Sequence, residues 1–300
     1  MPVKVKIAGL KPSGFIKALL LLLVMVSTLV KADSDTSARE HNTPPRIISI
    51  DGSLTEIVYA LDAGEQLVAV DTTSRYPQAA TELPDVGYMR RLSTEGILSL
   101  KPDLVIASQD AGPAEVFTQL HQAGVSVVRV RNEYTLAGVL AKVDQVAQAL
   151  NKQQQGEQLK QTIQQQTSAA LAAIPENAAA PETLFILGAG NRGLMAAGKN
   201  TQAQAMLDLL AANNVMDYEG YKPVSAEGAL LANPHVVLVA HTGPTDSDAV
   251  TTSLMMTDAQ KNNRIHTVNT SVVLGFGPRL GEAVKQLADV LYPQALAGAE

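Results

Sequence analysis

One stretch of this sequence is written twice, and the duplication limits the folds that the chain can adopt. Residues 93–106 read STEGILSLKPDLVI, and residues 225–237 read SAEGALLANPHVV. Ser, Glu, Gly, Leu, Pro and Val recur at the same offsets without a gap. Each copy predicts a short helix that begins at its serine and ends before its proline, with a β-branched strand behind it. The repeat therefore indicates two similar lobes.

Short apolar segments alternate with helical ones in both predicted lobes. The first lobe, residues 46–135, has predicted strands at 46–50, 67–70, 104–107 and 125–130, and helices at 57–61 and 114–122. The second, residues 182–300, has predicted strands at 183–187, 236–240 and 265–268, and helices at 202–210, from 225, at 253–260 and at 281–291. Such alternation is typical of a parallel sheet covered on both faces. We predict an α/β fold of two Rossmann-like lobes with parallel sheets.

A long amphipathic stretch separates the two predicted lobes. Apolar residues from Leu136 to Leu150 fall on one helical stripe, and a weaker, glutamine-rich stripe continues to Ile174, with Gly156 as a candidate break. A continuous helix over 136–176 would be about 60 Å long at ~1.5 Å per residue. We predict a bridging helix that runs across both lobes.

The N-terminus predicts export from the cytoplasm. Four lysines precede an apolar run from Ala18 to Val30, and Val30-Lys31-Ala32 offers small residues at the cleavage positions. The run is shorter than the ~20 apolar residues of a membrane span. We therefore predict a signal peptide over residues 1–32, a polar, flexible leader over 33–45, and a mature protein in the bacterial periplasm that is not embedded in the membrane. The absence of cysteine removes disulfides, thiolate metal sites and the lipid attachment of a lipoprotein.

Composition and motifs argue against two function classes. A net charge of -6 over 300 residues, with four Phe and no Trp, gives neither the basic surface nor the stacking groups of a nucleic-acid binder. Residues 188–193 match G-x-G-x-x-G, but the helical pattern starts only near Thr201, whereas a dinucleotide turn needs the helix at its third glycine. A nucleotide-dependent oxidoreductase remains a remote alternative. No catalytic motif is present, and we predict that the protein is not an enzyme.

Tyr88 is the side chain with the most distinctive chemistry. It lies in a glycine-led loop, and Arg90 stands two residues on, where a guanidinium favours the phenolate form. A phenolate is a hard anionic oxygen that suits Fe(III), and tyrosine is an axial ligand of haem iron. His241 directly follows the strand at 236–240, which places it at the cleft as a candidate ligand-facing group.

The two copies also share an exposed acidic position. Glu95 and Glu227 stand in the first turn of their predicted helices, where the helix dipole favours a negative charge. Helix capping alone explains the serine and glutamate of each copy. Their repetition on two lobes also predicts paired acidic groups on one surface, able to meet two arginines of a symmetric partner.

Several segments together resemble periplasmic haem-binding proteins of haemin ABC importers. The likeness covers nearly all of the chain after the leader. The segments read DTTSRYP at 71–77, LPDVGYMR at 83–90, LSTEGILSLKPDLVIAS at 92–108, MAAGKNT at 195–201 and LGFGPR at 274–279. The LKPDLV segment marks a wider group that also carries vitamin B12 and ferric siderophores. The Gly-Tyr-Met-Arg loop is the part that resembles the haem carriers.

The resemblance implies two α/β lobes with little hinge motion and ferric haem in the cleft between them. It implies Tyr88 as axial ligand, Arg90 hydrogen-bonded to the phenolate, and Glu95 and Glu227 docked on an inner-membrane ABC permease. Candidates for the propionates are Arg91 and Arg279. His241 stands where many members have an arginine, and is a further candidate.

One family feature is missing from this chain. Some members have a second, histidine ligand in the loop after the first strand of the second lobe, and residues 188–193 contain none. A carrier for a ferric siderophore or a corrinoid is the nearest alternative, since it needs no anionic iron ligand.

Overall fold

The computed structural model describes residues 44–188, 194–241, 254 and 256–293. All the elements below belong to one compact unit, residues 45–300. The predicted signal peptide and nearly all of the predicted leader lie outside the described residues. No helix in the described ranges combines the length and apolar character that crossing a membrane requires.

The first lobe is built on a four-stranded parallel sheet with the order β2-β1-β3-β4. Its strands are β1 Ile47–Ile50, β2 Leu67–Val70, β3 Leu104–Ser108 and β4 Ser126–Val130. Its helices are α2 Gly52–Ala60, α3 Thr94–Ser99 and α4 Ala114–Gln122, with 3-10 turns η1 Gly64–Gln66 and η2 Gln78–Glu82. The predicted parallel sheet is confirmed for this lobe.

Both faces of the first sheet are covered. Ile47 and Ile106 belong to one buried cluster, which includes Ile57 of α2, whereas Ile48 belongs to another, which includes Phe117 of α4. Successive side chains of a strand point to opposite faces, so strands buried on both sides read as continuous apolar runs. This explains why β1 and β3 have almost no polar residues.

The second lobe has a mixed sheet with the order β10-β9-β5-β6-β8, and β7 pairs beside β5. Its strands are β5 Glu182–Gly188, β6 Leu194–Ala197, β7 Asn213–Asn214, β8 Tyr221–Pro223, β9 Val236–His241 and β10 Ile265–Asn269. Strands β10, β9 and β5 are parallel, as predicted. Strands β6 and β8 were not predicted, and they are antiparallel because the chain returns beside β5 instead of entering a helix.

The described residues of the second lobe form five helices. They are α7 Gln202–Leu209, α8 Ala226–Ala232, α10 Asp258–Lys261, α11 Thr270–Val273 and α12 Leu280–Leu291. Of the helix predicted over 253–260, residues 253 and 255 lie outside the described residues. The structure begins α10 at Asp258, because the Thr257 hydroxyl caps it by accepting a hydrogen bond from the backbone N–H of Gln260.

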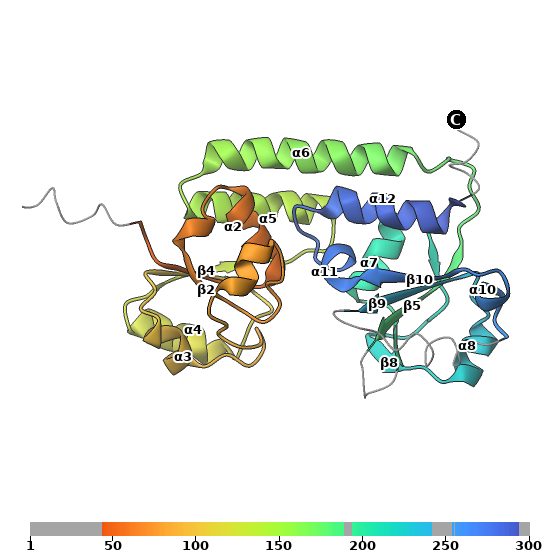
Figure 1. The fold of residues 1–300 in the computed structure, drawn as a ribbon, viewed down its shortest axis with the longest axis horizontal. Coiled ribbons are helices and arrows are strands. Elements are labelled where there is room, and N and C mark those ends of the chain that lie inside the picture. The colour runs from red at the N-terminus through yellow and green to blue at the C-terminus, as the bar shows by residue number, and fades with distance from the viewer. Residues whose placement is uncertain (1–43, 189–193, 242–253, 255, 294–300) are drawn as a thin grey trace, which may run out of the picture. The chain divides into compact units, whose positions relative to one another are not determined.

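Two helices replace the single bridging helix predicted over 136–176. They are α5 Leu136–Ala149 and α6 Gln153–Ala172. The break lies at Asn151, whose φ of 55° is in the left-handed region, which asparagine adopts more readily than most residues. Helix α6 has 20 residues and is therefore about 30 Å long. It packs against α5 and α12, as Figure 1 shows.

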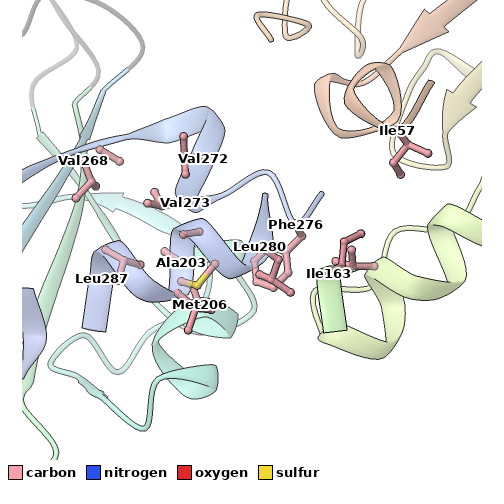
Figure 2. Packing of buried hydrophobic residues seen from close by; sticks show 14 of the residues in the cluster. Ile57, Ile163, Ala203, Met206, Val268, Val272, Val273, Phe276, Leu280 and Leu287 are labelled. Carbon is pink, nitrogen blue, oxygen red and sulfur yellow. The ribbon is translucent and has the colours of Figure 1, made fainter. Parts of the chain in front are cut away.

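One buried apolar cluster extends through both lobes. Figure 2 shows part of it, with Ile57 of α2, Ile163 of α6, Met206 of α7 and Leu280 of α12. Phe276, which is 1% exposed, belongs to the same cluster. Helix α6 thus contributes to a core shared by both lobes.

Candidate functional site

Residues from both lobes line a pocket of about 410 Å³. The first lobe supplies loop residues that follow β1, β2 and β4, residues of α2 near its start, and the segment Tyr88–Arg90. The second supplies Leu187 near the end of β5, Gln202 of α7, Tyr221 of β8 and the segment from Thr270 to Gly275. Most of these groups lie beyond the carboxyl ends of parallel strands, where open α/β sheets bind their ligands.

The turn that presents Tyr88 is fixed by main-chain hydrogen bonds on each side. Gly87 has a φ of 94°, a conformation that glycine adopts without strain. Its N–H donates to Asp85 Oδ1 at 2.6 Å, and its carbonyl accepts from the N–H of Thr72 at 3.1 Å. Beyond Tyr88, the N–H of Arg91 donates to the Tyr88 carbonyl at 2.7 Å. The phenol is 42% exposed.

Three tyrosines line the pocket, and they differ in burial. Burial, followed by the charge of Asp110, raises the pKa of Tyr134, with the charge of Arg90 acting in the opposite direction. Burial also raises the pKa of Tyr221. Both therefore remain neutral phenols near pH 7. Among the described residues, none hydrogen-bonds the exposed Tyr88 phenol, which leaves its oxygen available to a ligand.

Tyr134 is held in place by groups from both lobes. Its hydroxyl donates to Asp110 Oδ2 at 3.2 Å and accepts from Gln202 Nε2 at 3.2 Å. Its ring contacts Phe276, with ring centroids 5.4 Å apart. Because the Tyr134 hydroxyl already makes these hydrogen bonds, Tyr134 has a structural role in the pocket.

A strained acidic residue lies at the start of α2. Asp51 has a φ of 115°, which costs a non-glycine residue of the order of 1–3 kcal/mol and recurs at ligand sites. Its N–H donates to Asp71 Oδ1 at 2.9 Å, and its own carboxylate accepts from the N–H and the hydroxyl of Ser53, each at 2.8 Å. Burial raises the pKa of Asp71, and the hydrogen bonds that it accepts act in the opposite direction.

A buried lysine beside the pocket joins the two lobes. Lys142 of α5 is 1% exposed, and its Nζ donates to Ser53 Oγ and to the carbonyl of Phe276, each at 2.9 Å. Burial lowers the pKa of Lys142, while the charges of nearby carboxylates, Asp51 first, act in the opposite direction.

An ion pair forms a second polar link between the lobes. Arg279 donates to both oxygens of Glu56 from Nε at 2.9 Å and from its terminal nitrogen at 2.6 Å, and its guanidinium lies 4.0 Å from the ring centroid of Tyr76. Burial alone would lower the pKa of Arg279, and the bonds to Glu56 raise it overall. Burial raises the pKa of Glu56, and the arginine opposes that shift.

The structure brings only two of the predicted haem-site residues to the pocket. Tyr88 and Arg90 line it, and no hydrogen bond joins them. Arg91 is exposed and is not among the described lining residues. Arg279 is occupied by Glu56, so the structure gives it a role in joining the lobes. His241 ends β9, is half-buried, and is likewise not among the described lining residues.

The repeated segments fold alike. Ser93 and Ser225 are the N-cap residues of α3 and α8, and their hydroxyls accept from the N–H groups of Gly96 at 3.3 Å and Gly228 at 3.1 Å. Glu95 and Glu227 are exposed in the first turns of these helices. Their role in docking stays a prediction.

Two further sequence motifs are placed by the fold. Residues 189–193 of the G-x-G-x-x-G match lie outside the described residues, but Gly188 pairs with Leu194 at the start of antiparallel strand β6. A strand therefore follows the match where a dinucleotide site needs a helix. Within the described ranges, no group of three or more His, Asp or Glu side chains is arranged to bind a metal ion.

Sequence reasoning missed most of the lining residues. Asp51, Glu56, Asn132, Tyr134, Gln202, Tyr221 and Thr270 were not singled out, yet all line the pocket. A usable signal was present, because Asp51, Asn132 and Thr270 follow within two residues of the ends of β1, β4 and β10. Polar residues at the carboxyl ends of predicted parallel strands are the natural candidates for a ligand site.

Comparisons with known proteins agree with this architecture. The family model described as periplasmic binding protein matches residues 47–270. The periplasmic haem-binding protein RhuT from Roseiflexus sp. RS-1, in its apo form, is 34% identical with a TM-score of 0.78, over 84% of this chain and 100% of that one. The periplasmic haem-binding protein BhuT, in complex with two haems, is 37% identical with a TM-score of 0.76, over 84% and 99%.

A relative with another ligand is also similar. The vitamin B12-binding protein of Pectobacterium atrosepticum is 29% identical over 85% of this chain and 91% of its own length. The match over residues 47–270 means that this chain belongs to the periplasmic binding protein family, and that haem-binding members of the family are among its structural neighbours.

Proposed function

We propose that this protein is a periplasmic carrier of ferric haem, in which the Tyr88 phenolate binds the iron, and that it delivers haem to an inner-membrane ABC importer. The observation that carries the proposal is the exposed Tyr88 phenol in a pocket lined by both lobes. The other two lining tyrosines are held as neutral phenols. An anionic oxygen suits Fe(III), and the neighbouring haem-binding structures support the choice of haem.

Arg90 supplies positive charge on the same side of the pocket. It is the basic residue among the described lining residues, and it is exposed next to Met89, which is 9% exposed. A nearby cation stabilises an anionic iron ligand or a haem propionate by charge. No reaction on haem is part of the proposal, because a carrier binds and releases its ligand unchanged.

Titration with haemin tests the iron ligand. Wild-type protein should bind haemin with a visible absorption band from tyrosinate-to-iron charge transfer, and Tyr88→Ala should lose both tight binding and this band. Tyr76→Ala is a matched control, because Tyr76 is also exposed, at 48%, but does not line the pocket. Full affinity and an unchanged band in Tyr88→Ala would rule out Tyr88 as the ligand.

A corrinoid or a ferric siderophore is the second candidate ligand, and the vitamin B12-binding relatives favour the corrinoid. Such a ligand needs no phenolate, so its affinity should not depend on the Tyr88 oxygen. Parallel titrations with haemin and cyanocobalamin separate the two: tight binding of cyanocobalamin with no haemin band would replace our proposal.

For the importer, we propose that Glu95 and Glu227 bind one basic site on each half of a two-fold symmetric permease. Both are exposed at equivalent places in α3 and α8. Changing both to alanine should leave haemin affinity intact and stop stimulation of the reconstituted importer. Glu115→Ala is the control, since it removes an exposed first-turn glutamate from α4, which is not part of the repeat. Stimulation that survives the double change would refute this docking mode.

We also propose that the protein reaches the periplasm by cleavage of a signal peptide after Ala32. The charged and apolar segments before Val30-Lys31-Ala32 support this. Mass spectrometry of protein recovered from the periplasm should give an N-terminus at Asp33. Retention of residues 1–32 in the recovered protein would refute cleavage.

A further inference from the structure

The turn that carries Tyr88 is attached to a neighbouring turn of the first lobe, residues 108–112. The N–H of Gly112 donates to the carbonyl of Met89 at 2.9 Å, and the N–H of Leu92 donates to the carbonyl of Gly112 at 3.1 Å. A single residue, Gly112, therefore binds the backbone on both sides of Arg90 and Arg91. The position of Tyr88 relative to the pocket depends on where the 108–112 turn lies.

Arg129 of β4 organises this second turn. Its Nε donates to the Ser108 carbonyl at 3.3 Å, and one terminal nitrogen donates to the carbonyls of Gln109 at 2.8 Å and Ala111 at 3.0 Å. The guanidinium also lies 3.8 Å from the ring centroid of Phe117 in α4, which is 6% exposed. One planar cation thus holds three carbonyl groups of a single turn, residues 108–112, against the core.

The carbonyl groups of Gln109 and Ala111 depend on Arg129 for a hydrogen-bond donor. Within the described part of the chain, no other hydrogen bond reaches the carbonyls of Gln109 and Ala111. A guanidinium offers several donors in a fixed plane, whereas the lysine ammonium is a compact charge on a flexible stem. Loss of Arg129 would leave both acceptors without this donor, of which the Ala111 carbonyl is partly buried and the Gln109 carbonyl exposed, and would release the turn that holds Met89 and Leu92.

We propose that Arg129 is a positioning residue for the iron ligand: by fixing residues 108–112 it holds the Tyr88 turn in the conformation that binds ferric haem. This inference rests on the proposed haem-carrier function. Arg129 is not among the described residues that line the pocket, so it acts on the ligand through the 108–112 turn. If its loss reduces the population of the competent turn tenfold, haem affinity falls by about tenfold.

The test compares Arg129→Met with a matched control, Arg264→Met. Arg264 is a partly buried arginine that likewise donates to main-chain carbonyls, those of Val290 and Leu291 at 2.9 Å each, but in the second lobe. Arg129→Met should weaken haemin binding about tenfold and reduce the tyrosinate-to-iron band even at saturating haemin. Arg264→Met should leave both unchanged. Arg129→Lys should restore part of the band, and it replaces Arg129→Met if that variant does not fold.

A double-mutant cycle with Tyr88→Phe separates positioning from a general structural role. If Arg129 acts through Tyr88, Arg129→Met should weaken haemin binding less in the Tyr88→Phe protein than in the wild type. An equal loss in both backgrounds would overturn the proposal, as would an unchanged band and affinity in Arg129→Met.

Amide hydrogen exchange on the apo protein gives a readout that needs no ligand. Arg129→Met should speed exchange at the N–H groups of Leu92 and Gly112 and leave α12 unchanged, and unchanged exchange at these two amides would overturn the proposal. Faster exchange in a protein whose wild type does not bind haemin would support the positioning role of Arg129 while refuting haem as the ligand. Failure of the positioning role of Arg129 and failure of the proposed haem-carrier function therefore give different results.

Discussion

The two repeated segments form equivalent helices, α3 and α8, but the chain that precedes each helix has a different structure. In the first lobe, α3 follows a loop that is free of sheet pairing after Gly87 and exposes Tyr88 to the pocket. In the second lobe, α8 follows β8, which pairs with β6 and fixes Tyr221 in a sheet. The repeated helices α3 and α8 thus each expose a glutamate, Glu95 or Glu227. The chain that precedes each helix determines whether a tyrosine is available to a ligand.

The largest expected effect tests whether the two lobes unfold together or separately. Arg279→Met removes the partner of Glu56, whose side chain is 8% exposed, and an unpaired buried charge costs about 3 kcal/mol or more of unfolding free energy. Urea unfolding should still be a single transition, because one apolar cluster extends through both lobes. Lys285→Met, which breaks an exposed pair with Asp289, should cost less than ~1 kcal/mol. Two separate transitions in the wild type would contradict the shared core.

The second prediction compares the tyrosines of the two lobes. Tyr88→Phe should weaken haemin binding by about 100-fold, equivalent to about 2.7 kcal/mol, because it removes the oxygen proposed to bind iron. Tyr221→Phe removes an oxygen of the same kind from a partly buried phenol and should retain the charge-transfer band. Absorption titrations of both variants measure the difference. Similar losses of haemin affinity and of the band in the two variants would mean that Tyr88 and Tyr221 do not differ in their role.

The third prediction concerns Lys142, which links the lobes and has a pKa lowered by burial. Between that lowered pKa and the ordinary value of 10.5, the unfolded chain binds the proton more tightly than the native state does. Stability from this group therefore rises with pH, by at most ~1.4 kcal/mol per pH unit. Unfolding free energies measured from pH 7 to pH 10 should shift in favour of the wild type over Lys142→Met. A difference that falls with pH would reverse the assigned direction.

The smallest expected loss of stability comes from removing an N-cap hydroxyl, and it should be equal in the two lobes. Ser93→Ala and Ser225→Ala each remove an N-cap hydroxyl, at a cost of about 1 kcal/mol of stability. Ser99→Ala is a control within α3, because Ser99 bonds the Gly96 carbonyl inside the same helix. Thermal unfolding of the three variants measures these costs. A loss confined to one cap would mean that the repeated helices are not equivalent in energy.

Elements with local signals were predictable from the sequence. Strand β2 Leu67–Val70 and helix α4 Ala114–Gln122 have the predicted bounds, since an apolar run and a helical period with a glycine stop are both local patterns. The break at Asn151 was missed because an apolar stripe continues on both sides of it. Strand β6 was missed because its four residues, Leu-Met-Ala-Ala, have no alternation.

The site was predictable only in part. The Tyr88 loop was found from its own composition, and Tyr88 lines the pocket, while its role as a ligand stays a prediction. The partner of Arg279 was not predictable, because Glu56 lies 223 residues away in the sequence and the pair exists only when the lobes meet. The same applies to Lys142, whose bonds to Ser53 and to the Phe276 carbonyl span 89 and 134 residues.

Helix α6 also sets how this molecule can be divided. It is encoded with the first lobe, yet it packs along α12, which is encoded last. A gene cut between residues 173 and 181 would give a first fragment with an apolar helix face left uncovered and a second fragment with part of its core open to water. We expect neither piece to persist alone, and coexpression to restore a working whole, which suits the chain to split-reporter designs.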